Sequence, residues 1–293
     1  MMFLSIITPT YNRGYILPKC YKSLLIQTCD DFEWIVVDDG STDDTEQIVN
    51  NFINDAIIKI KYIKQENGGK HRAHNTAVKV ADGEMIICVD SDDLLTEDAV
   101  SLVKKYWEEN GSTKYAGILA KRGNMVDRQA ICSAWPKHLK SSTMFELIEK
   151  YGFYGDTALF FRTDILKENL FVEFEEEKFL PESNLYCDID KIGEMLLWDK
   201  VIYLCEYLPD GLTAKFHTLL KKNPNGTADT YYKMMCLANS ARTRLKYAVL
   251  VNIYSSISKS KSELKFNDKR GWLFIAKLPA MILKKNFWEK VER

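Results

Sequence analysis

The 293-residue sequence predicts an α/β fold with a mostly parallel central sheet, helices on both of its faces and a helical C-terminal extension. Short apolar runs rich in β-branched residues alternate with helical patterns through the first half, as in chains that build parallel sheets. Each run is followed by acidic, Gly-rich or other polar residues, and ligands of such sheets bind where the strands end. The hydrophobic share of 46% and the charged share of 28% are ordinary for a globular protein.

The first half contains four predicted strands, each followed by a predicted helix. The strands are 3–8, 34–37, 57–63 and 85–89, and the helices are 16–28, 43–54, 70–81 and 96–110. Asp82-Gly83 is a stop signal for the third helix, and Gly111 ends the fourth. The second half is less regular, with strands at 157–162 and 201–205, a turn-rich stretch at 223–226 and a helical pattern at 229–256.

The net charge of −1 hides an asymmetry along the chain. Residues 229–293 contain 14 Lys and Arg against 5 Asp and Glu, whereas residues 1–228 contain 26 against 36, so the net charges are +9 and −10. A basic, aromatic tail on an acidic body indicates that the tail binds an anionic surface, such as the headgroup region of a membrane. Packing on the body, or on another subunit of a homo-oligomer, is the equal alternative. No nucleic-acid-binding motif accompanies the basic residues, so no nucleic-acid partner is expected.

The cysteines and the N-terminus predict a cytoplasmic protein, peripheral at the inner face of the cell membrane if the tail binds lipid. Seven widely spaced cysteines without a Cys-x-x-Cys pair favour free thiols in a reducing compartment. The N-terminus has no basic segment before its apolar run, so no signal peptide is expected. The apolar tract at 272–283 is interrupted by Lys277 and Pro279 and is too short to span a bilayer.

Asp90, Asp92 and Asp93 crowd three carboxylates behind the fourth predicted strand, in EMIICVDSDDLL. Neighbouring carboxylates raise one another's pKa, so their crowding needs a reason. A helix cap would need only one acid, and a carboxyl dyad that shares a proton is a second alternative. A divalent cation is favoured, because Mg²⁺ is commonly held by one or two carboxylates together with substrate phosphates.

Two other strand ends carry less specific signals. Asp38-Asp39-Gly40 follows the second strand, where an Asp can accept a hydrogen bond from a base or a ribose, or can simply hold a turn. Gly68-Gly69-Lys70 follows the third strand, but Lys64 and His71 stand where a phosphate-binding P-loop needs Gly and Ser or Thr. No G-x-G-x-x-G follows a predicted strand, which disfavours a dinucleotide dehydrogenase.

Taken in order, IITPTYNR, IVVDDGSTDDT, ENGGKHRAHNTAVKVADGE and CVDSDD resemble the motifs of family 2 glycosyltransferases, whose GT-A fold has a Rossmann-like sheet. The four blocks span residues 3–95, and FLPESNLYCDI and CEYLPDGLT are similar to members that build bacterial surface polysaccharides. The resemblance implies a catalytic domain at 1–225, followed by the basic, aromatic extension at 226–293. Within that domain, 1–110 would bind the nucleotide-sugar and 111–225 the acceptor.

The resemblance also implies roles for the residues that follow the first two strands. The family binds a nucleotide-sugar, most often a UDP-sugar, over this half of the domain. Pro9, Thr10 and Tyr11 would surround the base. Asp39 would read uracil, with Asp38 beside it.

A third set of implied residues faces the sugar diphosphate. Lys70 would approach the base or the phosphates, and Asp90-Ser91-Asp92 matches the DxD motif of the family. Asp90 would then face the ribose, while Asp92, together with Asp93, would hold Mn²⁺ or Mg²⁺ on the diphosphate. The cation would act as a Lewis acid for the leaving group.

Members of the family invert the anomeric centre and need a general base for the acceptor hydroxyl. Many relatives carry a Glu-Asp pair, but this sequence has Pro181-Glu182-Ser183, so Glu182 is the predicted base. The alternative is that Glu182 only starts a helix after Pro181. Asp156 is the reserve candidate for the base. His217 is a candidate metal or phosphate contact, with a plain surface histidine as the alternative.

The sequence therefore predicts a metal-dependent, inverting glycosyltransferase. Its donor would be a nucleotide-sugar, a UDP-sugar by resemblance, and its acceptor a hydroxyl of a glycan or lipid-linked molecule in bacterial cell-surface polysaccharide synthesis. A non-catalytic nucleotide-sugar-binding scaffold is the alternative outside the enzymes. A metal-dependent nucleotidyltransferase, which would consume a nucleoside triphosphate, is the alternative among them.

Overall fold

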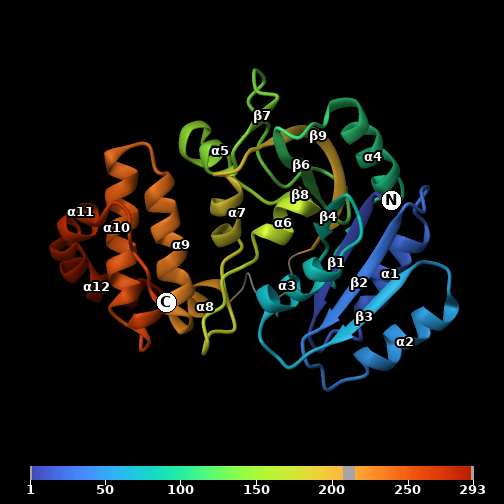
Figure 1. Ribbon diagram of the computed structural model, residues 1–293, viewed down its shortest axis with the longest axis horizontal. Coiled ribbons are helices and arrows are strands. Elements are labelled where there is room, and N and C mark those ends of the chain that lie inside the picture. The colour runs from blue at the N-terminus through green and yellow to red at the C-terminus, as the bar shows by residue number, and fades with distance from the viewer. Residues whose placement is uncertain (1, 207–214, 292–293) are drawn as a thin grey trace. The chain divides into compact units, whose positions relative to one another are not determined.

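The computed structural model of the chain describes residues 2–206 and 215–291. The chain divides into two compact units, one of residues 1–170 and 192–206 and the other of residues 171–191 and 207–293. Figure 1 shows the sheet and its helices in the first unit and helices α7 to α12 in the second. The division into a catalytic domain at 1–225 and an extension at 226–293 is a division by function, whereas the two units are defined by contacts. It stays a prediction.

The first unit is a mixed α/β structure. Its strands are β1 Leu4–Thr10, β2 Phe32–Asp38, β3 Ile60–Lys64, β4 Met85–Cys88, β5 Leu94–Leu95, β6 Tyr115–Asn124, β7 Ser141–Ser142, β8 Thr157–Arg162 and β9 Glu194–Cys205. Its helices are α1 Leu17–Leu25, α2 Thr45–Asp55, α3 Lys70–Val80, α4 Ala99–Asn110, α5 Met144–Tyr151 and α6 Thr163–Glu168.

The sheet is mostly parallel, as predicted. Its strand order is β3-β2-β1-β4-β8-β6-β9-β5, and β7 also pairs with β9. Strands β1 to β4 are parallel, and β8 is antiparallel to both β4 and β6, so β6 and its parallel partner β9 run in the same direction as β1. In register, Thr10 lies opposite Asp38 and Asp38 lies opposite Lys64, so the carboxyl ends of β1, β2 and β3 are level.

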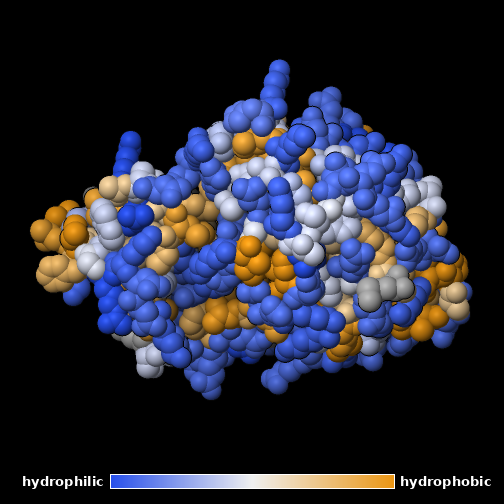
Figure 2. All heavy atoms as spheres, turned by 45° about the horizontal axis from the view of Figure 1, so that its top comes forward, coloured by the Kyte–Doolittle hydropathy of each residue, from blue (hydrophilic) through white to orange (hydrophobic). Residues whose placement is uncertain are grey.

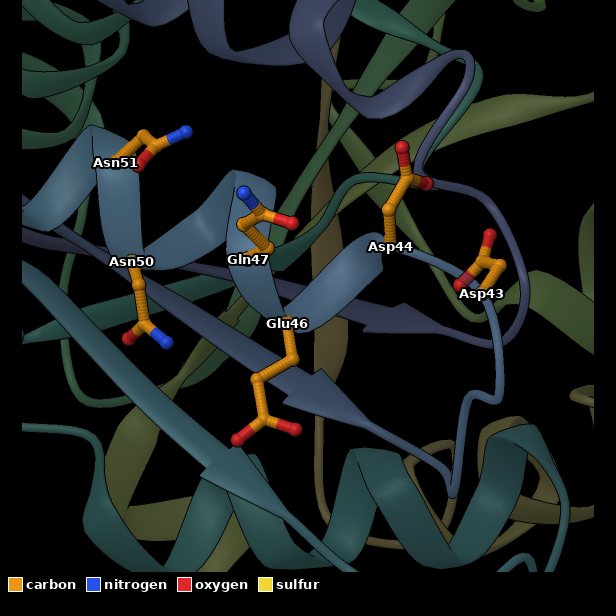
Figure 3. A pocket seen from close by; sticks show the side chains of 6 residues that line it. All are labelled: Asp43, Asp44, Glu46, Gln47, Asn50 and Asn51. Carbon is orange, nitrogen blue, oxygen red and sulfur yellow. The ribbon is translucent and has the colours of Figure 1, made fainter.

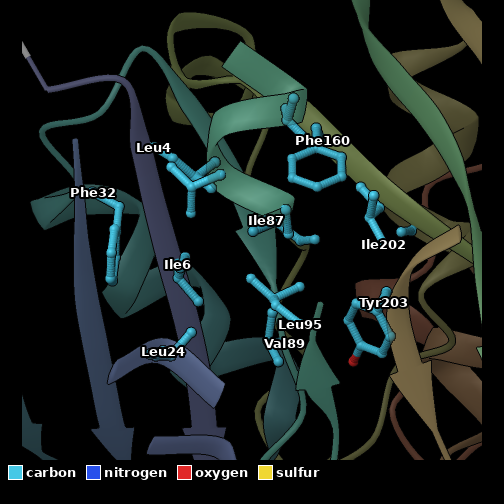
Figure 4. Close-up of a cluster of buried hydrophobic side chains, with 14 of the residues drawn as sticks. Leu4, Ile6, Leu24, Phe32, Ile87, Val89, Leu95, Phe160, Ile202 and Tyr203 are labelled. Carbon is cyan, nitrogen blue, oxygen red and sulfur yellow. The ribbon is translucent and has the colours of Figure 1, made fainter. Parts of the chain in front are cut away.

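Helices cover both faces of the sheet because side chains alternate between the faces along each strand. On one face, alternate residues of β1, β2 and β4 pack with α1, α2 and α4 in a single core, part of which is drawn in Figure 4. There Leu4 and Ile6 of β1 lie beside Leu24 of α1 and Ile87 of β4. Helix α3 packs on β1 and β2, with Ala73 and Ala77 buried, and contacts α6.

The second unit is helical in its described part. It contains α7 Ser183–Ile189, α8 Phe216–Lys222, α9 Pro224–Leu237, α10 Ala241–Ser255, a 3₁₀ turn at Lys261–Glu263, α11 Arg270–Ile275 and α12 Lys277–Val291. None of the helices in the described ranges combines the length with the apolar run that crossing a bilayer requires.

The structure corrects two local predictions in this unit. The helical pattern at 229–256 is two helices, because Ser240 caps a new helix by accepting a hydrogen bond from Thr243 N. The stretch at 223–226 is the first turn of α9 rather than a free turn. Pro224 suits that first position, and the buried Glu177 carboxylate accepts hydrogen bonds from Asn225 N and Gly226 N at 2.6 and 2.7 Å.

Candidate functional site

The polar segments that follow β1 and β2 are tied together at one edge of the sheet. Asp39 N donates a hydrogen bond to Thr10 O at 2.8 Å. Asn12 N donates to Ser41 Oγ, and Thr42 N donates to Asn12 Oδ1, each at 2.8 Å. These bonds give the edge a defined backbone, as the parallel arrangement of the two strands predicts.

Asp39 connects this edge to the segment between β3 and α3. Its Oδ1 accepts hydrogen bonds from Gln65 Nε2 at 2.8 Å and Gly68 N at 2.9 Å. Its Oδ2 accepts from Asn67 Nδ2 at 3.1 Å and Gly69 N at 2.7 Å. Asp39 is buried, and two donors at each oxygen match the lone pairs that a carboxylate offers. In this structure its carboxylate therefore holds the 65–69 segment.

Two glycines allow the backbone to approach the Asp39 carboxylate in this way. Gly69 has a φ of +96°, a conformation that side chains with a Cβ rarely adopt, and its N–H points at Asp39. Gly40 has a φ of +83°, and a Cβ there would lie 2.9 Å from Asn67 N. Asp38, next to this turn, accepts hydrogen bonds from Ser41 N at 2.7 Å and from the Tyr62 hydroxyl at 2.8 Å.

Lys70 brings the start of α3 to the acids behind β4. Its Nζ lies 2.6 Å from Asp90 Oδ1, and both side chains are about a quarter exposed, at 26% and 29%. An ion pair at this exposure is accessible to a ligand and is worth little stability on its own. All four polar strand ends that the sequence singled out thus lie along one edge.

Asp93 is buried and is bound by residues of β9 and β6. Its Oδ2 accepts a hydrogen bond from the Tyr203 hydroxyl at 2.7 Å, and the same hydroxyl accepts one from Asp90 N at 3.1 Å. The Arg122 guanidinium lies 4.1 Å from the Tyr203 ring centroid and 3.9 Å from Asp93 Oδ2. Burial and the charge of Asp90 raise the pKa of Asp93 to about 7, although the Tyr203 hydrogen bond opposes the shift.

Asp92 is the third acid of the group. Burial raises the pKa of its carboxyl, and the charge of Asp90 raises it further, while Arg13 and Lys70 act in the opposite sense. Within the described ranges, no three His, Cys, Asp or Glu side chains come together as a ready-made metal site. The donors available at the edge are carboxylate oxygens, the type that Mg²⁺ and Mn²⁺ prefer.

Thr10 carries a buried hydroxyl at the end of β1. It is 3% exposed, and its Oγ1 has no hydrogen-bond partner among the residues that the structure describes. A buried hydroxyl without a partner costs free energy, so a polar ligand group at this point would stabilise it. Beside it, Pro9 is buried and Tyr11 is 49% exposed, and Ser91 is buried next to the acids.

The remaining predicted residues lie elsewhere. Asp156 is exposed just before β8 in the first unit. Glu182 belongs to the second unit, where it precedes α7 and its Oε2 accepts a hydrogen bond from the Tyr186 hydroxyl at 2.9 Å. His217 is exposed in α8, with its ring against that of Phe216. Most of the quoted CEYLPDGLT block falls within 207–214, outside the described residues.

A separate hollow lies along α2, with a volume of about 440 Å³. Figure 3 shows its acidic and amide side chains, which belong to α2 and the turn before it. None of the predicted site residues lines it. The lining residues are Asp43, Asp44, Glu46, Gln47, Asn50 and Asn51.

Sequence reasoning missed the residues that support the acids and the Gly-rich segment. Tyr203 and Arg122 lie on β9 and β6, far along the chain, and nothing in their local pattern connects them with Asp93. Gln65 and Asn67 were more accessible to prediction. Both lie in the polar segment next to Gly68-Gly69, where amide side chains commonly support a turn.

Comparison with known proteins identifies a family over the first part of the chain. The family profile described as glycosyl transferase family 2 matches residues 5–170. This range contains the strand ends of the candidate site. It is also more than half of the chain.

Two curated relatives illustrate the similarity. A poly(ribitol-phosphate) beta-N-acetylglucosaminyltransferase, TarS of Staphylococcus aureus, is 30% identical over 210 residues, which are 69% of this chain and 35% of TarS. A GalNAc(5)-diNAcBac-PP-undecaprenol beta-1,3-glucosyltransferase of Campylobacter jejuni is 30% identical over 190 residues, 64% of this chain and 60% of that enzyme. The chain spans about a third or less of the length of several curated relatives that it matches.

A solved structure extends the likeness to nearly the whole chain. The crystal structure of S. aureus TarS 1-349 in complex with UDP-GlcNAc has a TM-score of 0.63 and 21% sequence identity, and the match covers 92% of this chain and 78% of that one. At this identity the likeness concerns the fold, and it confirms the expected fold class.

Proposed function

Because this chain belongs to glycosyltransferase family 2, we propose that it transfers a sugar from a nucleotide-sugar to a hydroxyl of a glycan or lipid-linked acceptor in bacterial cell-surface polysaccharide synthesis. The donor is a UDP-sugar and the anomeric centre is inverted. UDP-GlcNAc is the ligand named for the TarS complex, and an undecaprenol-linked glycan is named for the Campylobacter enzyme, so both are starting points for assays.

One observation carries the proposal: the ends of β1, β2 and β4 and the start of α3 meet at one edge of the sheet. A nucleotide-sugar needs a surface for a flat base, donors and acceptors for a ribose, and positive charge for a diphosphate. Thr10 and the partly exposed Tyr11 supply the surface for the base, and Asp90 supplies an acceptor for the ribose. Lys70 supplies the positive charge for the diphosphate.

In this proposal Asp38 and Asp39 shape the base subsite, and Lys70 exchanges its ion pair with Asp90 for the diphosphate. That exchange is accessible because the pair is partly exposed. Asp90, released from Lys70, can then accept a hydrogen bond from a ribose hydroxyl. Ser91, buried between the two acids, would line the same nucleotide-sugar site.

A divalent cation fits the acids at this edge. Asp90 and Asp92 offer hard carboxylate oxygens, and the raised pKa of Asp92, caused by burial and then by Asp90, reflects a repulsion that a cation would relieve. Asp92 would hold Mn²⁺ or Mg²⁺, which neutralises the charge that develops on the leaving diphosphate. Asp93, bound by Tyr203, would position this segment, and His217 is a further candidate ligand.

Glu182 is the proposed general base for the acceptor hydroxyl. The Tyr186 hydroxyl, one helical turn further on, donates to its carboxylate and orients it. Asp156 is kept as the reserve candidate.

The seven free cysteines support a place in the cytoplasm, where thiols stay reduced.

The donor side is tested by measuring nucleotide release and thermal stabilisation with UDP-, GDP- and TDP-sugars, each with and without Mn²⁺. UDP-sugars are expected to stabilise the protein most, and Asp92→Asn should lower turnover by about 100-fold. Asp127→Asn, a change at an exposed acid, is the matched control. Release of pyrophosphate from a nucleoside triphosphate would point instead to a nucleotidyltransferase.

The acceptor side is tested by separating binding from turnover. Glu182→Gln should lower transfer by about 100-fold or more while the affinity for UDP is unchanged, with Glu176→Gln as the exposed control. Unchanged transfer in Glu182→Gln and its loss in Asp156→Asn would move the base to Asp156. Tight UDP binding without turnover on any acceptor would indicate a scaffold.

A further inference from the structure

Helices α11 and α12 direct large apolar side chains outward. Six of them, between 49% and 75% exposed, occur within ten residues of chain. We call this set the α11–α12 apolar face, and Figure 2 shows hydrophobic residues gathered over these helices at its left edge. Other exposed large hydrophobic residues of the described chain are scattered. The face consists of Phe274, Ile275, Leu278, Met281, Ile282 and Leu283.

The helices pack on the rest of their unit through other residues. Ala276 and Ala280 are 0% and 4% exposed and belong to the core around α10, and the partly buried Trp272, Leu273 and Phe287 pack against it. Leu278, Met281 and Ile282 follow the spacing of one helical face, and this face points away from that core. A helix that served only to cover the unit would not also expose six large apolar residues. Their exposure leaves apolar area for another surface.

Positive charge borders the apolar face, and negative charge is missing from it. From Lys269 to Trp288 the sequence contains five Lys and Arg and no Asp or Glu. Lys277 is exposed, with its ammonium 5.5 Å from the Phe274 ring centroid. An apolar face with a cationic border matches the two layers of an anionic bilayer, the hydrocarbon and the phosphates above it.

A small hollow beside the face adds a place for a headgroup. It has a volume of about 220 Å³ and lies between α10 and α12. Lys277 and Lys284 line it together with Met281 of the apolar face. Two ammonium groups next to an apolar side chain suit a lipid phosphate whose acyl chains continue along the helix.

We propose that α11 and α12 dock on an anionic phospholipid bilayer. The apolar face enters the boundary between headgroups and acyl chains, and Lys277 and Lys284 bind lipid phosphates. The helices lie in the plane of the interface and do not span it. This docking is separate from sugar transfer, since it involves neither the acids behind β4 nor Glu182.

The experiment is co-sedimentation of the full chain with phosphatidylcholine vesicles, with and without phosphatidylglycerol. We expect binding to the anionic vesicles that weakens with salt, and little binding to the neutral ones. A triple variant, Leu278→Ser with Met281→Ser and Ile282→Ser, should bind at least about tenfold less. A charge variant, Lys277→Glu with Lys284→Glu, should lose the preference for phosphatidylglycerol.

Matched controls remove exposed residues of the same types from the first unit. Ile57→Ser with Val126→Ser and Lys105→Glu should bind vesicles like the unchanged chain. Thermal melting of every variant reports whether it is folded. Because vesicle binding is measured without substrate, its failure is distinguishable from a failure of the proposed function.

Three outcomes would overturn the proposal. They are no vesicle binding by the unchanged chain, equal binding to neutral and anionic vesicles, and binding that the triple variant retains. If the unchanged chain fails to bind vesicles and instead forms an oligomer that is lost in the triple variant, a second copy of the chain covers the face.

Discussion

At the scale of single residues, three crowded acids have three different surroundings. Asp93 is bound by the Tyr203 hydroxyl, Asp90 pairs with Lys70, and Asp92 is shifted toward its neutral form by burial and by Asp90. One of the three crowded carboxylates, that of Asp93, thus lies in the protein interior. The other two stay at the edge of the sheet, where a cation or a ligand would meet them.

Asp39 has a structural task that can be separated from base recognition. Asp39→Ala removes the carboxylate that accepts from Gln65 Nε2, Gly68 N and Gly69 N, while Asn67 Nδ2 keeps its bond to the backbone oxygen of residue 39, so we expect a loss of about 2–4 kcal/mol in the free energy of unfolding. UDP affinity should fall as well. Chemical denaturation and calorimetric titration measure the two effects, with Asp30→Asn at an exposed site as the control. Lost UDP binding at unchanged stability would mean that Asp39 acts on the base alone.

At the scale of elements, the order of the strands decides which residues become neighbours. β6 and β8 lie between β4 and β9, so the sheet brings Arg122 and Tyr203 to the acids behind β4. The close contact of β6 with β8 depends on a residue without a side chain. A Cβ at Gly117 would lie 1.9 Å from Phe160 O, far inside van der Waals distance.

Gly117→Ala is therefore expected to destabilise the first unit by about 3 kcal/mol or more, since the backbone of β6 or β8 must move. Gly271→Ala, at a position in α11 with no neighbour within 4 Å, is the control and should change stability by about 1 kcal/mol or less. Thermal melting of both variants checks the difference. Equal melting midpoints for the two variants would show that β6 and β8 can move apart without a loss of stability.

A buried carboxylate on β2 should make the stability of the first unit depend on pH. Glu33 is fully buried and accepts hydrogen bonds from Ser5 Oγ at 2.8 Å and Asp82 N at 2.7 Å, and Lys61 Nζ lies 2.8 Å away. Burial raises the pKa of Glu33, but the hydrogen bond from Lys61 and those from Asp82 and Ser5 outweigh it and lower the pKa below its ordinary value.

A carboxyl with a lowered pKa in the folded state contributes stability above its unfolded pKa and loses it as the pH falls through the folded pKa. Glu33→Gln should therefore be less stable than the unchanged chain near neutral pH, and the difference should shrink as the pH falls below about 4.5, the ordinary pKa of a glutamate. Urea unfolding across this range measures the difference. A gap that stays constant with pH would argue against the assignment to Glu33.

At the scale of the whole molecule, the cysteine thiols report on packing. All seven cysteines are free, and Cys20, Cys187 and Cys205 are buried. Burial raises the pKa of the Cys187 and Cys205 thiols to about 12, so they stay protonated at neutral pH.

A thiol reagent such as DTNB should react promptly with no more than the four partly exposed cysteines of the native protein, and with all seven after unfolding. The thermal midpoint should be the same with and without a reducing agent, because no disulfide contributes to stability. A midpoint that falls on reduction would contradict this.

Sequence patterns alone predicted the types and order of the elements from β1 to α4, apart from the short strand β5, and with them the edge where a ligand would bind. Apolar alternation and the polar strand ends are local signals, and parallel pairing places those ends side by side. The acids behind β4, Asp38-Asp39 and Lys70 all lie where this reasoning expects them. The helix start at Pro224 was read as a turn because Glu177, which stabilises it, lies 48 residues away from Asn225.

Packing between elements determines which distant residues support the site and which face of the tail is covered. Tyr203 is 110 residues from Asp93, and the bond between them exists because of the strand order β4-β8-β6-β9. Local periodicity predicts that a segment is a strand, but it does not say which other strands become its neighbours. Likewise, composition predicted a basic, aromatic tail, but its periodicity did not predict that Ala276 and Ala280 would pack on the core around α10 while Leu278, Met281 and Ile282 stay exposed.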